Sequence, residues 1–173
     1  MSAPDPRLRC HNSRPRPGSP SPASRLMASI RVSTVVPAAP AVVWEDLRHI
    51  DRHVEWMSDA DSIRFLTDAT EGAGVLFDCV TRLGPIRLID RMEVTDWRDA
   101  QTMAIRHRGV VTGVGEFRLT PRPVAVGEVH TEFEWSESLR FPWWMGGPVG
   151  AVAARPVLRA LWKRNLRTFA ARF

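Results

Sequence analysis

The sequence contains no tyrosine, a single lysine and only two cysteines in 173 residues. Without tyrosine, no phenol can serve as an acid, a base or a hydrogen-bonding anchor. Cys10 and Cys79 lie far apart in segments of different composition, which argues against a disulfide framework and favours a reducing, cytoplasmic location. No stretch approaches the roughly 18 apolar residues of a membrane-spanning helix, so stable membrane insertion is not expected.

Positive charge is concentrated at the start of the chain. The formal net charge is +5, and residues 1–26 contain five arginines and one aspartate, so the remainder is nearly neutral. This distribution argues against nucleic acid as a partner, because a nucleic-acid-binding domain carries its basic residues on a folded face. Residues 1–27, rich in arginine, proline and serine, are expected to be disordered because they cannot bury enough apolar surface.

Two interpretations of this tail stay open. It is either a disordered extension that binds anions weakly, or no part of the natural protein, with translation starting at Met27 just before the first strand. The abrupt change in composition favours the second interpretation. The folded domain is expected to span residues 28–173.

The order of periodic patterns is typical of an α+β protein. A strand over residues 30–36 precedes two short helices around Trp44 and Trp56, where apolar residues recur at helical spacing. Further strands are predicted over residues 63–66, 75–82, 86–97, 101–109, 114–120 and 129–140. Pro121 to Gly127 is predicted to be a turn region. A C-terminal helix carries an apolar stripe, and Pro156 is expected to start or kink it.

This order resembles the START-like superfamily, also called SRPBCC or polyketide cyclase/dehydrase-like. The similar segments are Pro40-Ala41-Val42-Val43-Trp44, His53-Val54-Glu55-Trp56 and the late strand entering Phe141-Pro142-Trp143-Trp144. The resemblance covers about residues 28–173. It implies a helix-grip fold, in which a curved antiparallel sheet of six to seven strands wraps around the long C-terminal helix and an apolar cavity. Superfamily members include lipid carriers, hormone-binding proteins and aromatase/cyclases, so the resemblance identifies a fold rather than a function.

Strand phase predicts which side chains face the cavity. The expected ligand-binding residues are Trp56, Phe77, Cys79, Met92, Ile105, Phe133, Trp135, Trp143, Trp144 and Asn165. Cys79 is expected to act as a small buried hydrophobe rather than a nucleophile. Asn165 interrupts the apolar stripe of the last helix, where its amide binds either a ligand or a backbone carbonyl.

Three ionisable residues, Asp90, His107 and Glu137, fall in phase with apolar neighbours. Burying them costs free energy unless they are partnered. A neutral imidazole at position 107 can donate and accept a proton near pH 7, so His107 is a candidate proton shuttle oriented by either carboxylate. The alternatives are a polar anchor for a ligand, a polar pocket floor, or strand ends that meet solvent.

No metal site and no cofactor are predicted. His49 and His53 have a spacing found in metal sites, but a third ligand is not evident. Gly113-Val114-Gly115 opens a strand rather than a helix, so it does not match a dinucleotide-binding fingerprint.

The loop from Phe141 to Gly147 joins the last strand to the last helix. Trp143 and Trp144 are adjacent and cannot both point inward easily, while Gly146 and Gly147 give the backbone freedom. This loop is interpreted as a lid over the cavity, a membrane-surface anchor, a dimer contact or a packed corner.

The leading hypothesis is that the protein binds a hydrophobic small molecule, such as a lipid, a polyketide or an aromatic metabolite. One alternative, implied by the resemblance, is an aromatase/cyclase-type enzyme that uses His107 with a carboxylate. Another is a protein-interaction module that uses the Trp143–Trp144 loop. Enzyme versus carrier, the identity of the ligand, and whether the protein forms a homodimer stay open.

Overall fold

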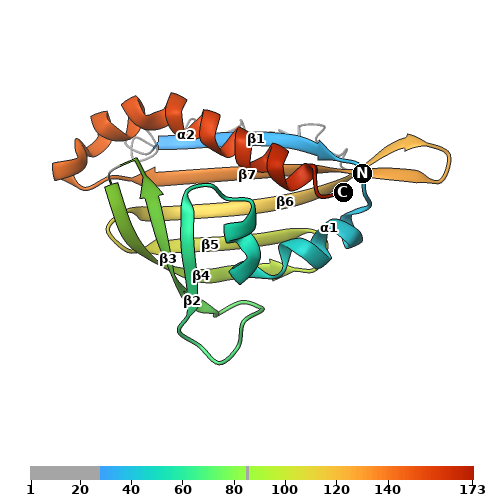
Figure 1. Ribbon diagram of the computed structural model, residues 1–173, viewed down its shortest axis with the longest axis horizontal. Coiled ribbons are helices and arrows are strands. Elements are labelled where there is room, and N and C mark those ends of the chain that lie inside the picture. Colours follow the sequence, from blue (N-terminus) through green and yellow to red (C-terminus); the bar gives the residue numbers. More distant parts are fainter. Residues whose placement is uncertain (1–27, 85) are drawn as a thin grey trace, which may run out of the picture.

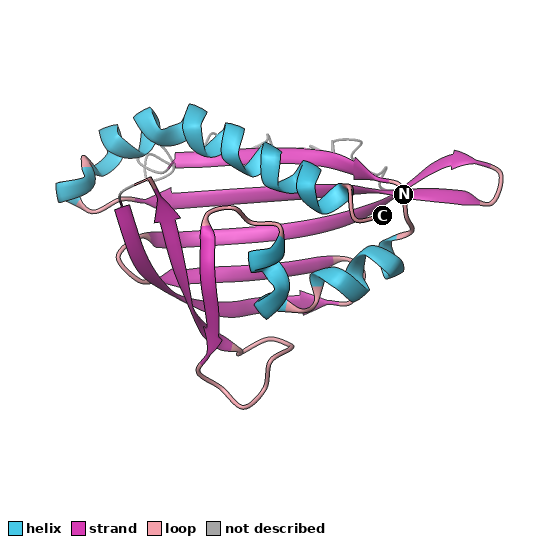
Figure 2. Cartoon of the chain, viewed as in Figure 1, coloured by secondary structure: helices cyan, strands magenta, loops and turns pink. Residues whose placement is uncertain are grey.

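The computed structural model describes residues 28–84 and 86–173, and the predicted tail over residues 1–27 lies outside them. A curled antiparallel sheet of seven strands, in the order β1-β7-β6-β5-β4-β3-β2, wraps around one long helix (Figures 1 and 2). The strands are β1 (Ala28–Val36), β2 (Ala60–Phe65), β3 (Leu76–Leu83), β4 (Ile86–Arg98), β5 (Thr102–Arg108), β6 (Thr112–Ala125) and β7 (Glu128–Arg140). The helices are α1 (Pro40–Leu47), η2 (Ile50–Glu55), η3 (Trp143–Met145) and α2 (Gly147–Ala170). This is the predicted α+β helix-grip fold.

The long helix α2 lies across the concave side of the sheet. It buries an apolar stripe at helical spacing that includes Leu158, Trp162, Leu166 and Phe169. α2 begins at Gly147 and passes through Pro156, so the prediction that this proline starts the helix is wrong. Pro156 is exposed, which lets water reach the carbonyl that loses its helical partner. Among the described residues, no helix is long and apolar enough to cross a membrane.

The predicted turn over residues 121–127 is shorter in the structure. β6 continues through Pro121 and Pro123 to its end and pairs with β7 along this stretch. The N–H of Leu119 donates to the carbonyl of Gln101 at 2.8 Å, on the β5 side. Because N–H groups alternate sides along a strand, both proline nitrogens face that same side, where β5 has already ended. No ladder hydrogen bond is lost, and the β6–β7 hairpin projects beyond the sheet (Figure 1).

An aromatic cluster joins η2, the sheet and α2. The ring of Trp56 has its centroid within 5.0 Å of Phe169, 6.0 Å of Phe117 and 6.3 Å of Phe133. Most of these rings meet edge to face, which is the arrangement that their quadrupoles favour. This cluster fills one part of the space between sheet and helix and confines the hollow part to the remainder.

Candidate functional site

A cavity of about 150 Å³ lies between the concave face of the sheet and α2. Its apolar wall is built from strands and helix together: Phe77, Cys79, Met92, Met103, Ile105, Phe117, Trp135, Leu158 and Trp162. A dry apolar cavity of about this size holds one benzene-sized ring. Val110, in the loop after β5, also lines the cavity and is 43% exposed, so the cavity reaches solvent beside this loop.

Asp90, His107 and Glu137 meet on the wall of this cavity. Nδ1 of His107 lies 2.5 Å from Oδ2 of Asp90, and its Nε2 lies 3.1 Å from Oε2 of Glu137. The indole N–H of Trp135 donates to Oε1 of Glu137 at 3.1 Å. Each member of this charged triad is more than nine-tenths buried. The three residues that share a phase in the sequence thus form one hydrogen-bonded unit.

Glycines in the sheet make room for the triad. His107 lies on β5 and Glu137 on β7, so their backbones are separated by β6 and stand roughly 10 Å apart. The β6 residues paired with them are Gly113 and Gly115. A Cβ atom on Gly115 would lie 2.5 Å from Oε1 of Glu137, which shows that the carboxylate occupies the space of the missing side chain. The contact between His107 and Glu137 can therefore cross an intervening strand.

Asp90, the other carboxylate of the triad, is also accommodated by a glycine. A Cβ atom on Gly109 would overlap the carboxylate of Asp90 on the neighbouring strand β4. Oδ1 of Asp90 is buried and has no hydrogen-bond partner among the described residues. The triad thus has one unsatisfied acceptor at its β4 end.

The pKa of His107 reflects two opposing influences. Burial on its own lowers this pKa, but the hydrogen bonds to Asp90 and Glu137 and the charges of these carboxylates outweigh it and raise the pKa to about 10. His107 is therefore an imidazolium at neutral pH that donates one N–H to each carboxylate. This corrects the predicted neutral imidazole, since a protonated ring has no lone pair with which to accept a proton.

His53 also lines the cavity, but its ring is neutral. Burial lowers its pKa to about 4, because no carboxylate is hydrogen-bonded to it. Its ring Nε2 lies 2.7 Å from the carbonyl oxygen of Leu47, and a neutral ring donates to that oxygen. The two buried histidines show that carboxylate partners, rather than burial, decide the charge on this wall.

Some of the predicted binding residues lie away from the cavity wall. Trp56 and Phe133 belong to the aromatic cluster and contact Phe169. Trp143 and Trp144 are 87% and 56% exposed on η3. Strand and helix phase gave the face of Trp56 and Phe133 correctly, but not the depth at which the cavity ends.

Asn165 is also absent from the cavity wall, because its polar atoms are already bound by the protein. Its Oδ1 accepts hydrogen bonds from the N–H of Ser58 at 3.1 Å and from the hydroxyl of Ser58 at 2.9 Å. Its Nδ2 donates to Asp59 at 2.7 Å. Asn165 therefore fastens the segment after η2 to α2.

Several lining residues were missed by sequence reasoning. Phe117 shares the cavity face of β6 with Gly115, so strand phase could have found it. Phe141 and Met145 line the cavity from the segment after β7, where no period predicts direction. Asp59 lines it from a loop, and burial raises the pKa of its carboxyl despite the Asn165 hydrogen bond.

The chain is similar to known proteins in sequence and in fold. The family described as "Polyketide cyclase / dehydrase and lipid transport" matches residues 27–173. The crystal structure of the Zhui aromatase/cyclase from Streptomyces sp. R1128 has a TM-score of 0.62 and 18% identity, over 84% of this chain and 93% of that chain. The di-domain ARO/CYC protein StfQ of the steffimycin biosynthetic pathway has a TM-score of 0.68 and 14% identity, over 85% of this chain and 50% of that chain.

XoxI from Bacillus cereus has a TM-score of 0.65 and 14% identity, over 85% of this chain and 96% of that chain. At these identities the likeness shows the fold alone. No curated protein sequence matches this chain significantly.

The charge on His107 predicts a loss of stability at alkaline pH. Its folded-state pKa of about 10 exceeds the unfolded value, so its stabilising contribution is complete below about pH 6.5 and disappears as the pH rises toward 10. We expect the free energy of unfolding to fall by about 2 kcal/mol between about pH 6.5 and pH 8.5, as measured by urea titration. In an Asp90→Asn/Glu137→Gln variant this decline should vanish. A flat wild-type profile, or ring nitrogen shifts of a neutral His107 in NMR spectra at pH 7, would contradict the assignment.

The Glu137 carboxylate occupies the space beside Gly115, so substitutions at these two positions are expected to be energetically coupled. Gly115→Ala should displace the Glu137 carboxylate and cost about 1–3 kcal/mol of unfolding free energy through overpacking. The same substitution in a Glu137→Ala background should cost almost nothing, because the space is then vacant. A double-mutant cycle measures this difference, and additive effects would show that the glycine and the carboxylate do not compete for space.

Proposed function

Because the chain belongs to the polyketide cyclase/dehydrase and lipid transport family, we propose that it binds an apolar small molecule carrying a ring in the cavity under α2. The observation that carries this proposal is an apolar cavity of about 150 Å³ with a buried charged triad on its wall. That volume suits one ring at the inner end, and the opening beside Val110 leaves room for a larger ligand to extend outward. The charged triad orients the ligand, while the apolar wall supplies the affinity.

The triad also limits the charge of the ligand. Two carboxylates and one imidazolium leave a net negative wall, and no lysine or arginine lines the cavity within the described residues. An anionic headgroup buried there would have no free cation as a partner and would be repelled by the carboxylates. The buried end of the ligand is therefore not anionic, and it bears a hydroxyl, a carbonyl or an amine rather than a carboxylate.

Binding of a neutral fluorescent probe tests this function. N-phenyl-1-naphthylamine should bind the folded protein saturably, and decanol should displace it better than decanoate. Met92→Trp should fill the cavity and weaken probe binding tenfold or more, at a stability cost of about 1–3 kcal/mol. Val126→Trp, at an exposed position on the β6–β7 hairpin, is the matched control and should bind as the wild type does. Absent probe binding, or unchanged binding in a folded Met92→Trp variant, would refute the proposal.

A second candidate function is catalysis of the aromatase/cyclase type, and the buried triad favours it. Cyclisation of a poly-β-ketone needs a base for a carbon-bound proton and an acid for a carbonyl oxygen. Asp90 and Glu137 are the available carboxylate bases, and the imidazolium of His107 is the acid. The 3.1 Å contact with Glu137 is the longer of the two histidine contacts, so a ligand carbonyl would take that N–H.

Substitutions in the triad separate binding from catalysis. If the protein is a cyclase, Glu137→Gln and His107→Gln should lower turnover of a poly-β-ketone about a hundredfold or more while probe binding persists. His107→Gln removes the cation between two buried carboxylates and is expected to destabilise the fold, so Glu137→Gln is the cleaner variant. His130→Gln alters a histidine outside the cavity and serves as the control. Equal turnover in Glu137→Gln and His130→Gln would rule out catalysis by this triad and leave the binding function intact.

A further inference from the structure

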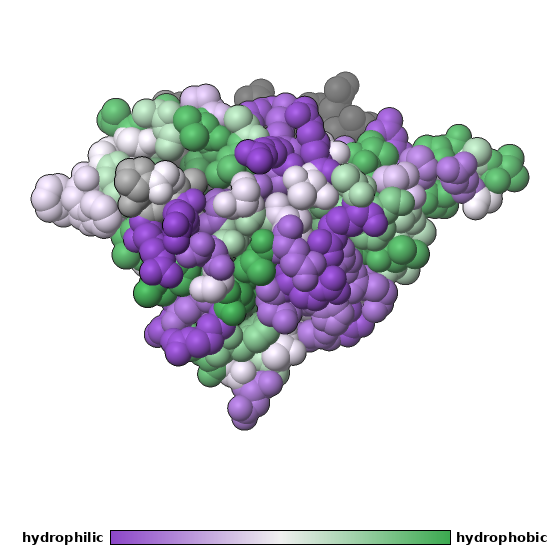
Figure 3. All heavy atoms as spheres, viewed as in Figure 1, coloured by the Kyte–Doolittle hydropathy of each residue, from purple (hydrophilic) through white to green (hydrophobic). Residues whose placement is uncertain are grey.

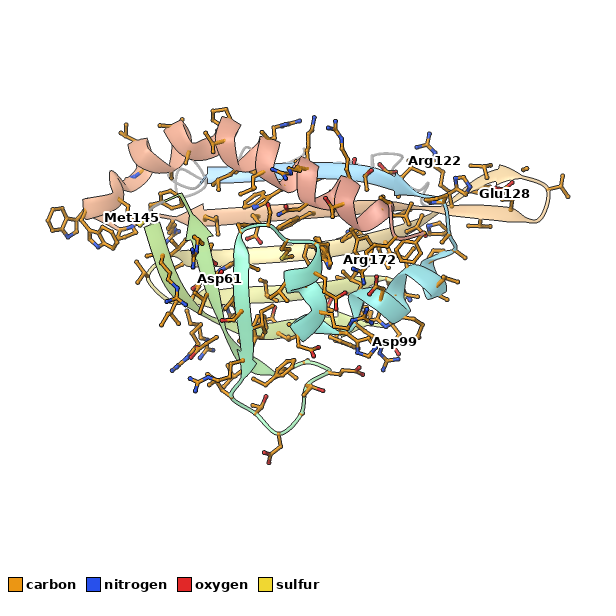
Figure 4. All side chains as sticks on the ribbon, viewed as in Figure 1. Asp61, Asp99, Arg122, Glu128, Met145 and Arg172 are labelled. Carbon is orange, nitrogen blue, oxygen red and sulfur yellow. The ribbon has the colours of Figure 1, made fainter. Side chains whose placement is uncertain are left out.

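The segment at the start of α2 exposes large apolar side chains. Trp143 and Trp144 on η3 are 87% and 56% exposed, and Val149 and Val152 on the first turns of α2 are 78% and 50% exposed. Figure 4 marks this end of the molecule with Met145. Adjacent tryptophans in water are costly unless something covers them. The start of α2 and the preceding η3 therefore form an exposed apolar tip, which is typical of a surface that contacts another molecule.

The charge of the last segment indicates what that occupant is. Residues 138–173 contain seven basic residues and no aspartate or glutamate. On α2 the exposed members are Arg159, Lys163, Arg164 and Arg167, and none forms an ion pair with any residue in the described ranges. Figure 3 shows hydrophobic atoms over the first half of α2 and hydrophilic atoms over its second half.

Helical spacing puts both halves on one outer face. Val149, Val152, Arg159, Lys163 and Arg167 follow each other at intervals of three, four or seven residues, on an exposed face that flanks the stripe that α2 buries against the sheet. The outer face of α2 is thus apolar toward the tip and basic toward the C-terminus. Together with Trp143 and Trp144 it is called here the Trp–basic surface.

We propose that the Trp–basic surface docks the protein on an anionic lipid bilayer. Tryptophan is the side chain that prefers the headgroup region, where its apolar ring and polar N–H are both accommodated. Basic residues beside it are attracted to anionic headgroups, and the combination lies on the interface instead of spanning the bilayer.

A second copy of the chain fits this surface less well. A symmetric dimer through α2 would give the basic residues of each copy no acidic partner, because each copy would present the same patch. Mutual repulsion of those charges opposes such a contact. An anionic lipid surface supplies the charge that a second copy lacks.

Docking at this place would connect the bilayer with the cavity. Phe141 and Met145 flank the two tryptophans in the sequence, and both line the cavity. A docked tip would bring this part of the cavity wall next to the lipid, so an apolar ligand would move between them with little exposure to water. This consequence rests on the proposed function, whereas docking itself does not.

Vesicle flotation at low ionic strength tests the proposal. The full chain should float with vesicles of phosphatidylcholine mixed with phosphatidylglycerol, bind pure phosphatidylcholine weakly, and be released by salt. Trp143→Ala/Trp144→Ala should weaken binding about tenfold or more. Arg159→Glu/Lys163→Glu/Arg167→Glu should weaken it on the order of a hundredfold.

Matched controls lie at the opposite end of the molecule, where Figure 4 labels Arg122. Arg122→Glu and Val126→Ser change an exposed charge and an exposed apolar side chain on the β6–β7 hairpin, and both should float as the wild type does. In the absence of vesicles, the charge-reversed variant should bind N-phenyl-1-naphthylamine normally, which separates loss of docking from loss of the cavity.

Three outcomes would overturn the proposal. The first is failure of the folded chain to float with the mixed vesicles. The second is equal flotation of the wild type and both surface variants. The third is a dimer in sedimentation experiments that the tryptophan substitutions dissociate, which would make this surface a contact between copies of the chain.

Discussion

The hydrogen bonds that join His107 to Asp90 and Glu137 are the interaction on which the rest of the site depends. A buried carboxylate without a cation costs several kcal/mol, and here two carboxylates share one imidazolium inside an apolar wall. The arrangement holds only while β4, β5 and β7 keep their register, because a shift of one residue would turn a member to the outer face of the sheet. It also requires a missing side chain at Gly115, since any Cβ there would meet the Glu137 carboxylate. The strand register and the triad therefore depend on each other.

Binding and catalysis place different demands on this wall. A binding protein needs the triad to stay closed, with both N–H groups of His107 held by carboxylates and the ligand oriented by what remains. A cyclase needs the triad to open, so that Glu137 moves aside and the imidazolium meets a carbonyl. The hydrogen bond from Trp135 holds Glu137 in its closed position from the other side. On the proposed cyclase function, a ligand would have to compete with that indole for Glu137, whereas the proposed binding function requires no such opening.

Much of this site could be predicted from the sequence, because alternation along β3, β4, β5 and β7 is regular enough to give the inward face. The same reasoning put His107 in phase with the apolar wall, but it gave no charge state, which depends on two carboxylates on other strands. Strand and helix phase also do not show how far the cavity extends. Trp56 and Phe133 face inward but lie where α2 and η2 close the interior. Asn165 was ambiguous because its partners lie more than a hundred residues earlier in the chain. The role of Gly115 could not be predicted for a similar reason. The space that this glycine leaves for the Glu137 carboxylate is evident only once the register of β6 with β5 and β7 is known.

Net charge taken over the whole folded part conceals how the charge is arranged. Residues 27–137 contain twelve basic and eighteen acidic side chains, whereas residues 138–173 contain seven basic and none acidic. The near neutrality of the domain is therefore a cancellation between an acidic sheet-and-helix portion and a basic C-terminal portion. Because fields depend on the separation of charges as well as on their sum, such a molecule presents one preferred face to any anionic surface even though its domain charge is close to zero. α2, which encloses the cavity with its buried face, carries most of that basic charge on its outer face, so the cavity wall and the basic face belong to one element.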